Sequence, residues 1–108
     1  MPTYNKLVRD KIPQIIESKG KQCRARILDE AQYLTELKLK LREETEEYNQ
    51  ASDSTSALEE LADILEVVHA LASAHGADWD QLEALRIQIA EARGGFKDRV
   101  CLIDVDEA

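Results

Sequence analysis

Two short acidic patterns lie in neighbouring segments that are otherwise rich in apolar residues. The first is Glu44-x-x-Glu47 in "KLREETEEY", and the second is Glu60-x-x-Asp63 in "EELADILEVVHALA". Residues three positions apart lie on the same side of a helix, so each pattern presents two carboxylates to one neighbour. Carboxylate oxygens are the hard ligands that suit Mg²⁺ and Mn²⁺, so these acids point to a divalent cation site.

The apolar periodicity of the two segments indicates which acids face the interior. At about 100° per residue, Glu44 falls among the apolar positions of its helix and Glu60 falls among those of the next helix. Glu47 and Asp63 lie at the edges of these apolar arcs. The other acids project outward and are expected to be solvated, which is the usual state of an acid-rich helix face: Glu43, Glu46, Glu59 and Glu66.

The turn "QASDSTS" allows the two helices to pack as an antiparallel hairpin. In that register Glu47 lies level with Glu60, Glu44 lies level with Asp63, and the two levels are about 4.5 Å apart. Four clustered carboxylates oppose one another's ionisation, and Lys40 supplies only one nearby positive charge. We therefore expect Glu44, Glu47, Glu60 and Asp63 to bind Mg²⁺, with Mn²⁺ as an alternative, and to leave positions for water and phosphate.

Capping residues and glycines divide the chain into four expected helices. These cover residues 11–18, 30–49, 56–75 and 79–93, and each stops at or shortly before a glycine or a polar turn. The expected N-caps are Asp10, Asp29 and Asp78. Trp79 is expected to anchor the start of the last helix or to contact another subunit, rather than to stack on a nucleotide base.

The elements predict an all-α single domain over residues 1–108, built as an antiparallel bundle of about four helices. An optional addition is a short two-stranded β pairing of residues 22–28, "QCRARIL", with residues 99–105, "RVCLIDV". Alternating apolar side chains in the first segment favour a strand.

Composition narrows the classes of partner. The formal charge of −8, from 22 acidic and 14 basic residues, disfavours binding along a nucleic acid polymer. We find neither a signal peptide nor an apolar run long enough for a bilayer, so a cytoplasmic location without membrane contact is the expectation. A chain of 108 residues commonly completes its burial by association, and Leu39 lies opposite the main apolar arc, so we expect a homodimer or homotetramer.

Taken together, the two acidic motifs resemble the signature of the all-α MazG-like nucleoside triphosphate pyrophosphohydrolases, which include the phosphoribosyl-ATP pyrophosphohydrolases. The segments "YNKLVRDKIPQII" and "RGGFKDRV" are similar to a small single-domain branch, so the resemblance covers nearly the whole chain. It implies Mg²⁺-dependent hydrolysis between the α- and β-phosphates of a small nucleotide, giving a monophosphate and pyrophosphate. It also implies that the acids at the four motif positions are the metal ligands. Glu47, or else Glu44, would orient or deprotonate the attacking water.

Basic side chains should supplement the metal on the phosphates. The expected contacts are Lys6, Arg9, Lys11, Lys40, Arg93 and Lys97, with Arg24 and Arg26 as a further local group. For each of them an ordinary solvated base is the competing interpretation. The segment "RIQIAEAR" carries Ile89 and Ala90 where relatives are expected to offer a lysine. Two alternatives therefore stay open: a non-catalytic nucleotide-sensing or protein-adaptor oligomer, and hydrolysis of phosphoribosyl-ATP.

Overall fold

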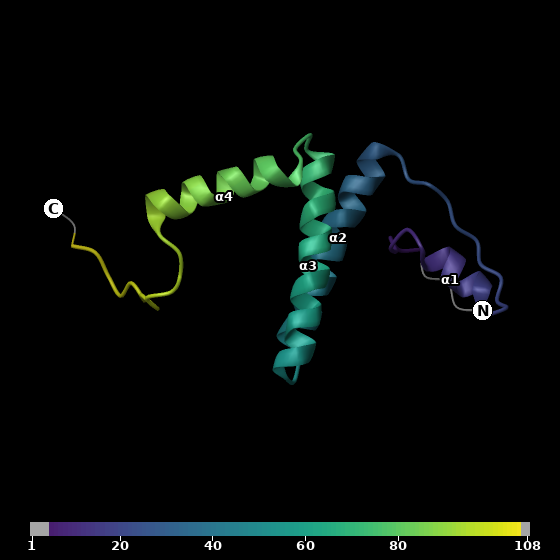
Figure 1. The fold of residues 1–108 in the computed structure, drawn as a ribbon, viewed down its shortest axis with the longest axis horizontal. Helices are drawn as coiled ribbons and strands as arrows, with labels where there is room; N and C mark the ends of the chain where they lie inside the picture. The colour runs from purple at the N-terminus through teal and green to yellow at the C-terminus, as the bar shows by residue number, and fades with distance from the viewer. Residues whose placement is uncertain (1–4, 107–108) are drawn as a thin grey trace.

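The computed structural model describes residues 5–106, which form four α-helices joined by turns and extended segments (Figure 1). The helices are α1 (Ile12–Ser18), α2 (Glu30–Asn49), α3 (Ser54–Ala74) and α4 (Trp79–Arg93). The predicted all-α class is confirmed over these residues. No helix in this part of the chain has the length and apolar character needed to cross a membrane.

The starts of α2, α3 and α4 follow from aspartate N-caps, as is common for short polar side chains that accept an orphan backbone N–H. Each carboxylate accepts from the backbone N–H three residues on: Asp29 from Gln32 at 2.8 Å, Asp53 from Ser56 at 2.7 Å, and Asp78 from Gln81 at 2.8 Å. At α4 the Gln81 side chain also accepts from the Asp78 backbone N–H, which completes a capping box. Because Asp53 is the cap, α3 begins two residues earlier than predicted.

The start of α1 differs from the prediction. Lys11, not Asp10, is the N-cap residue, and no side chain caps the helix. Pro13 lies in the first turn, where its missing N–H removes one donor that would otherwise need a partner. The prediction of Asp10 as a cap was therefore wrong.

The helices α2 and α3 form the packed part of the molecule (Figure 1). They run in opposite directions about a short turn, and Leu37 and Val67 are buried, at 3% and 8% exposure. At the other end of α3, α4 leaves at a wide angle, and the ring of Trp79 stacks on His69 with centroids 3.9 Å apart. Trp79 thus ties the start of α4 to α3, whereas the packing of all four helices into one bundle stays a prediction.

The predicted β pairing is absent from the described residues. Segments 22–28 and 99–105 contain no strand, and Figure 1 shows them at opposite ends of the molecule. Their apolar side chains face solvent in this single chain: Ile27 is 96% exposed and Ile103 is 90% exposed. Two isolated strands with no covered face are at best marginally stable in water, which explains why alternation alone did not produce a sheet.

Candidate metal centre

Three of the four acids predicted to bind metal come together between α2 and α3. Glu44 and Glu47 from α2 and Glu60 from α3 each offer a carboxylate oxygen, and these oxygens lie within 4.8 Å of one another. Ligands of Mg²⁺ sit about 2.1 Å from the ion, so one ion between them would need only small side-chain adjustments. We refer to Glu44, Glu47 and Glu60 as the acidic cluster.

The hairpin seam buries one member of the acidic cluster. Glu44 follows Leu37 by two helical turns and so shares its buried face, and it is only 8% exposed. Among the described residues it is the one charged side chain in the buried class. Glu60 is half-buried on α3, and Glu47 is exposed. The cluster therefore runs from the interior of the hairpin to solvent.

Two carboxylate oxygens inside the cluster lack a hydrogen-bond donor. Both Oε2 of Glu44 and Oε2 of Glu60 are buried without a partner among the described groups. A buried ionised carboxylate without compensation is costly, so this arrangement calls for a shared proton or for a cation at the same place. The donor set, made of carboxylate oxygens alone, suits a hard divalent cation.

Burial is the main cause of the raised pKa of two of these acids. It raises the pKa of Glu44 above its ordinary value, and contact with Glu47 raises it further, while Lys40 partly offsets the rise. Burial likewise raises the pKa of Glu60, with an added contribution from repulsion by Glu47. Both shifts mean that the ionised cluster is unfavourable by itself and that a positive charge placed there would stabilise it.

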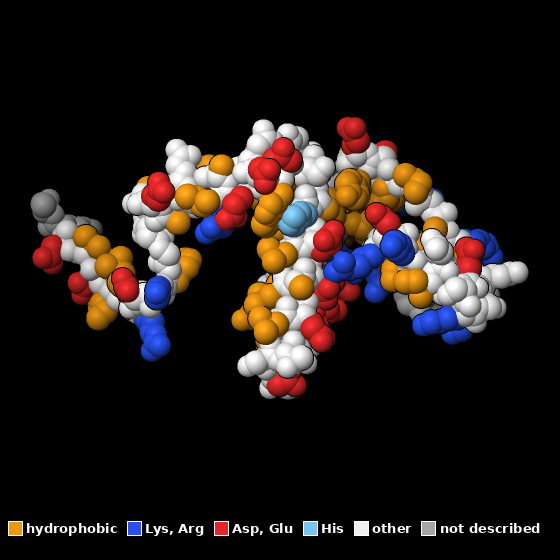
Figure 2. All heavy atoms as spheres, in the orientation of Figure 1, with side chains coloured by type: hydrophobic (Ala, Val, Ile, Leu, Met, Phe, Trp, Pro, Cys, Tyr) orange, Lys and Arg blue, Asp and Glu red, His pale blue; other side chains and the backbone are white. Residues whose placement is uncertain are grey.

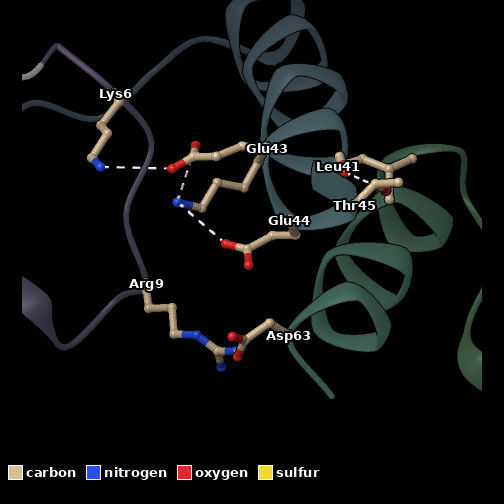
Figure 3. A network of polar contacts seen from close by, with 8 residues as sticks. Lys6, Arg9, Leu41, Glu43, Glu44, Thr45 and Asp63 are labelled. Carbon is tan, nitrogen blue, oxygen red and sulfur yellow. Dashed lines mark hydrogen bonds and ion pairs between the residues drawn. The ribbon is translucent and has the colours of Figure 1, made fainter. Parts of the chain in front are cut away.

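The internal positive charge nearest the cluster comes from Lys40 (Figure 3). Its Nζ lies 3.6 Å from Oε1 of Glu44 and 3.6 Å from Oε2 of Glu43. Each contact follows the helical spacing at which side chains on α2 meet. One ammonium group shared between two acids leaves most of the negative charge of the cluster uncompensated.

The fourth predicted ligand, Asp63, lies beside the cluster and is held by another residue. Its Oδ1 accepts a hydrogen bond from the Arg9 guanidinium at 2.6 Å (Figure 3). Asp63 is still near enough for its charge to contribute to the raised pKa of both Glu44 and Glu60. The structure thus gathers three of the four predicted acids and pairs the fourth with a cation.

The predicted phosphate contacts separate into two groups. Lys6, Arg9 and Lys40 all lie near the acids, with Lys6 Nζ 3.8 Å from Oε1 of Glu43. Lys11 is the N-cap residue of α1 and lies in the same N-terminal segment as Lys6 and Arg9. By contrast, Arg93 ends α4 and Lys97 follows it, and Figure 1 shows that this part of the chain runs away from the hairpin. This chain alone does not bring those two side chains to the cluster.

Sequence reasoning missed the role of Glu43, which it assigned to a solvated face. In the structure Glu43 pairs with both Lys6 and Lys40. The spacing from Lys40 was a usable signal, since the two are three residues apart on one helix. The pairing of Arg9 with Asp63 joins residues 54 positions apart, so no local sequence pattern predicts it.

Comparisons of the chain with protein families, with curated proteins and with solved structures found no match.

Proposed function

We propose that this protein is an Mg²⁺-dependent nucleoside triphosphate pyrophosphohydrolase of the MazG-like superfamily, acting in the cytoplasm to remove unwanted nucleotides. The observation that carries the proposal is the acidic cluster. It combines the two motif segments on facing helices, an all-oxygen donor set, and two buried carboxylate oxygens without a donor. The motif resemblance supplies the reaction, which is hydrolysis between the α- and β-phosphates.

The different exposures of the three acids suit different roles. Glu44 and Glu60 each have a buried carboxylate oxygen without a hydrogen-bond partner among the described groups, which suits these two acids to hold the cation. Glu47 is exposed, so it can also reach a water molecule at the surface and orient or deprotonate it. When bound, Mg²⁺ supplies acidification of water and neutralisation of charge on the leaving pyrophosphate.

Self-association belongs to the same proposal because this chain is too open to be a complete domain. Its accessible surface is 9981 Å², whereas a compact monomer of this mass exposes about 6,100 Å². Its radius of gyration is 18.6 Å, against about 13 Å for a compact domain of this length. The excess surface, about 3,900 Å², exceeds what one subunit of a typical obligate dimer buries.

The face that a second copy would cover is an apolar stripe on α3, on the side away from α2 (Figure 2). Leu58, Leu61 and Leu65 line it, and at 66%, 40% and 50% exposure they leave much of their area in water. Figure 2 shows this stripe facing the hollow between α3 and the C-terminal arm, which consists of α4 and the segment after it, residues 79–106. A second copy seated there could also carry its own Arg93 and Lys97 toward the hairpin.

One observation favours the alternative of a nucleotide-binding protein without turnover. The last helix offers Ile89 and Ala90 at the place expected for a lysine, and both predicted C-terminal cations lie far from the acidic cluster in this chain. A sensor or adaptor would keep the cation and the nucleotide but release no product. Phosphoribosyl-ATP as substrate is the further alternative, and it shares the same site.

Pyrophosphate release tests the proposal. The purified full chain is incubated with a panel of nucleoside triphosphates and with phosphoribosyl-ATP, each with Mg²⁺ and with chelator. We expect Mg²⁺-dependent formation of monophosphate and pyrophosphate from at least one nucleoside triphosphate. Tight nucleotide binding without product would favour the sensor, and turnover of phosphoribosyl-ATP alone would favour the third function. A folded protein that neither binds nor hydrolyses any of them would end the proposal.

A further inference from the structure

The N-terminal arm, residues 5–18, lies beside the acidic cluster without helix packing to hold it there. Within the described part of the chain, α1 makes no packing contact with another helix. The arm reaches the hairpin through ion pairs instead: Arg9 with Asp63 on α3 at 2.6 Å, and Lys6 with Glu43 on α2 at 3.8 Å. Figure 2 shows the positive side chains of the arm against the negative side chains of the hairpin.

The Arg9 pair is the stronger of these two attachments, and it uses a motif acid. Arg9 is tied to the start of α1, because its carbonyl accepts the backbone N–H of Ile12 at 3.0 Å. The Arg9–Asp63 pair therefore attaches the adjoining end of the arm to α3. Both partners are partly open to water, with side-chain exposures of 56% and 39%. An ion pair of this kind contributes only about 0–1 kcal/mol, so it can be exchanged readily.

Asp63 cannot fully satisfy both Arg9 and a divalent cation at the neighbouring carboxylates. A cation in the acidic cluster would neutralise Glu44 and Glu60, whose repulsion Asp63 already feels, and would attract the Asp63 carboxylate inward. Arg9 would then face a cation of the same sign at short range. Each event therefore disfavours the other, which is a reciprocal coupling between two binding partners of one acid.

We propose that Arg9 is a built-in competitor of the divalent cation, so that loading the acidic cluster releases Arg9 from Asp63 and detaches the N-terminal arm from α3. This inference rests on the proposed metal site and adds a regulated residue to it. Once released, the guanidinium is free to bind a phosphate group of an incoming nucleotide. In the absence of the cation, the same guanidinium stays paired with Asp63 and keeps the N-terminal arm attached to α3.

Two measurements on the full chain test the exchange, and neither depends on turnover. The first is calorimetric titration with Mg²⁺ alone, or with Mn²⁺ alone, for wild type, Arg9→Gln and Arg42→Gln. Arg42 lies two residues from Glu44, on the opposite side of α2, so its substitution removes the same charge without touching Asp63. We expect Arg9→Gln to bind the cation about two- to fivefold more tightly than Arg42→Gln, the range that loss of one exposed ion pair allows.

The second measurement is limited tryptic cleavage after Lys6 and Lys11, with cleavage after the exposed Arg99 as the internal control. In wild type, Mg²⁺ should speed cleavage of the arm and leave the control site unchanged. In Arg9→Gln the arm should be cleaved quickly with or without Mg²⁺. The inference is overturned if Mg²⁺ does not alter cleavage of the wild-type arm, or if both variants bind the cation equally. A wild-type chain that binds no cation would remove the proposed function as well, whereas binding without any Arg9 effect would remove the competition alone.

Discussion

The hairpin and the two arms attached to it use similar residues in very different surroundings. In the hairpin, Leu37 and Val67 are buried and even a carboxylate, Glu44, is nearly removed from water. In the C-terminal arm, Phe96 is 98% exposed and Ile103 is 90% exposed. Apolar content is therefore not what separates the regions. In the hairpin, α2 and α3 pack on each other, whereas no other segment within residues 5–106 covers these apolar side chains of the C-terminal arm.

The largest expected effect on activity concerns Glu60, the half-buried acid that α3 contributes to the acidic cluster. Glu60→Gln keeps the shape of the side chain but removes a charge from the acidic cluster, so we expect hydrolysis to fall by more than the roughly 10- to 100-fold loss that follows removal of an indirect metal partner. Pyrophosphate release measures this. Glu59→Gln is the matched control, since Glu59 is exposed on the same helix. Equal activity in the two variants would contradict the assignment of the cluster.

The second prediction concerns the outer face of the hairpin, where the apolar stripe of α3 is open to solvent, as are apolar side chains of the arms. Leu65→Glu places a charge in the apolar stripe of α3, where half of the leucine surface is exposed. We expect the assembly to dissociate, lowering the mass in light scattering to that of a single chain. Ser73→Glu adds the same charge on the polar side of α3 and should leave the mass unchanged. A wild-type protein that is already monomeric would refute the predicted association.

The third prediction uses the raised pKa of Glu44. Because the pKa of Glu44 is raised in the folded, cation-free protein, its folding stability should fall as the pH rises from the ordinary value of 4.5 through the raised pKa. Thermal unfolding without metal should thus give a higher Tm at pH 5 than at pH 7. Glu44→Gln should reduce this difference and raise Tm at pH 7, because it removes the buried negative charge. Glu66→Gln, at an exposed site, should retain the wild-type pH dependence.

The smallest effect is expected on the stability of α4, at the start of the C-terminal arm. Asp78→Ala removes the capping box of α4 and should cost about 1 kcal/mol, confined to that helix. Amide hydrogen exchange should quicken in the first turn of α4 and stay unchanged between α2 and α3. Quicker exchange in the hairpin would show that α4 and the hairpin unfold together, and it would contradict their expected independence.

Local patterns predicted the parts of this molecule that local interactions determine. The caps Asp29 and Asp78, the bounds of α2 and α4, and the inward position of Glu44 follow from short-range spacing and periodicity. The expected cap at Asp10 was wrong because α1 begins one residue later: the backbone N–H of Ile12 donates to the carbonyl of Arg9, and Pro13 has no N–H to satisfy. In each case the deciding interactions lie within one or two helical turns.

Long-range pairing was the part that spacing could not supply. The helical projection placed Asp63 at the edge of an apolar arc as one of four expected metal ligands, yet Arg9, far away in the sequence, pairs with its carboxylate. Segment 22–28 alternates as strands do and segment 99–105 is rich in apolar residues, but nothing in the described part of this chain covers them, so no sheet forms. Both outcomes depend on which surfaces meet, and one helix or one strand contains no information about its neighbour.

The stacked rings of His69 and Trp79 also give this protein an optical probe. Trp79 is the single tryptophan of the chain, so all indole emission comes from the junction between α3 and α4. The imidazole of His69 lies 3.9 Å from the indole ring, so a movement of α4 away from α3 changes the surroundings of the fluorophore. The tryptophan emission can consequently be used to follow movement at the junction between α3 and α4 in the native protein, without any added label.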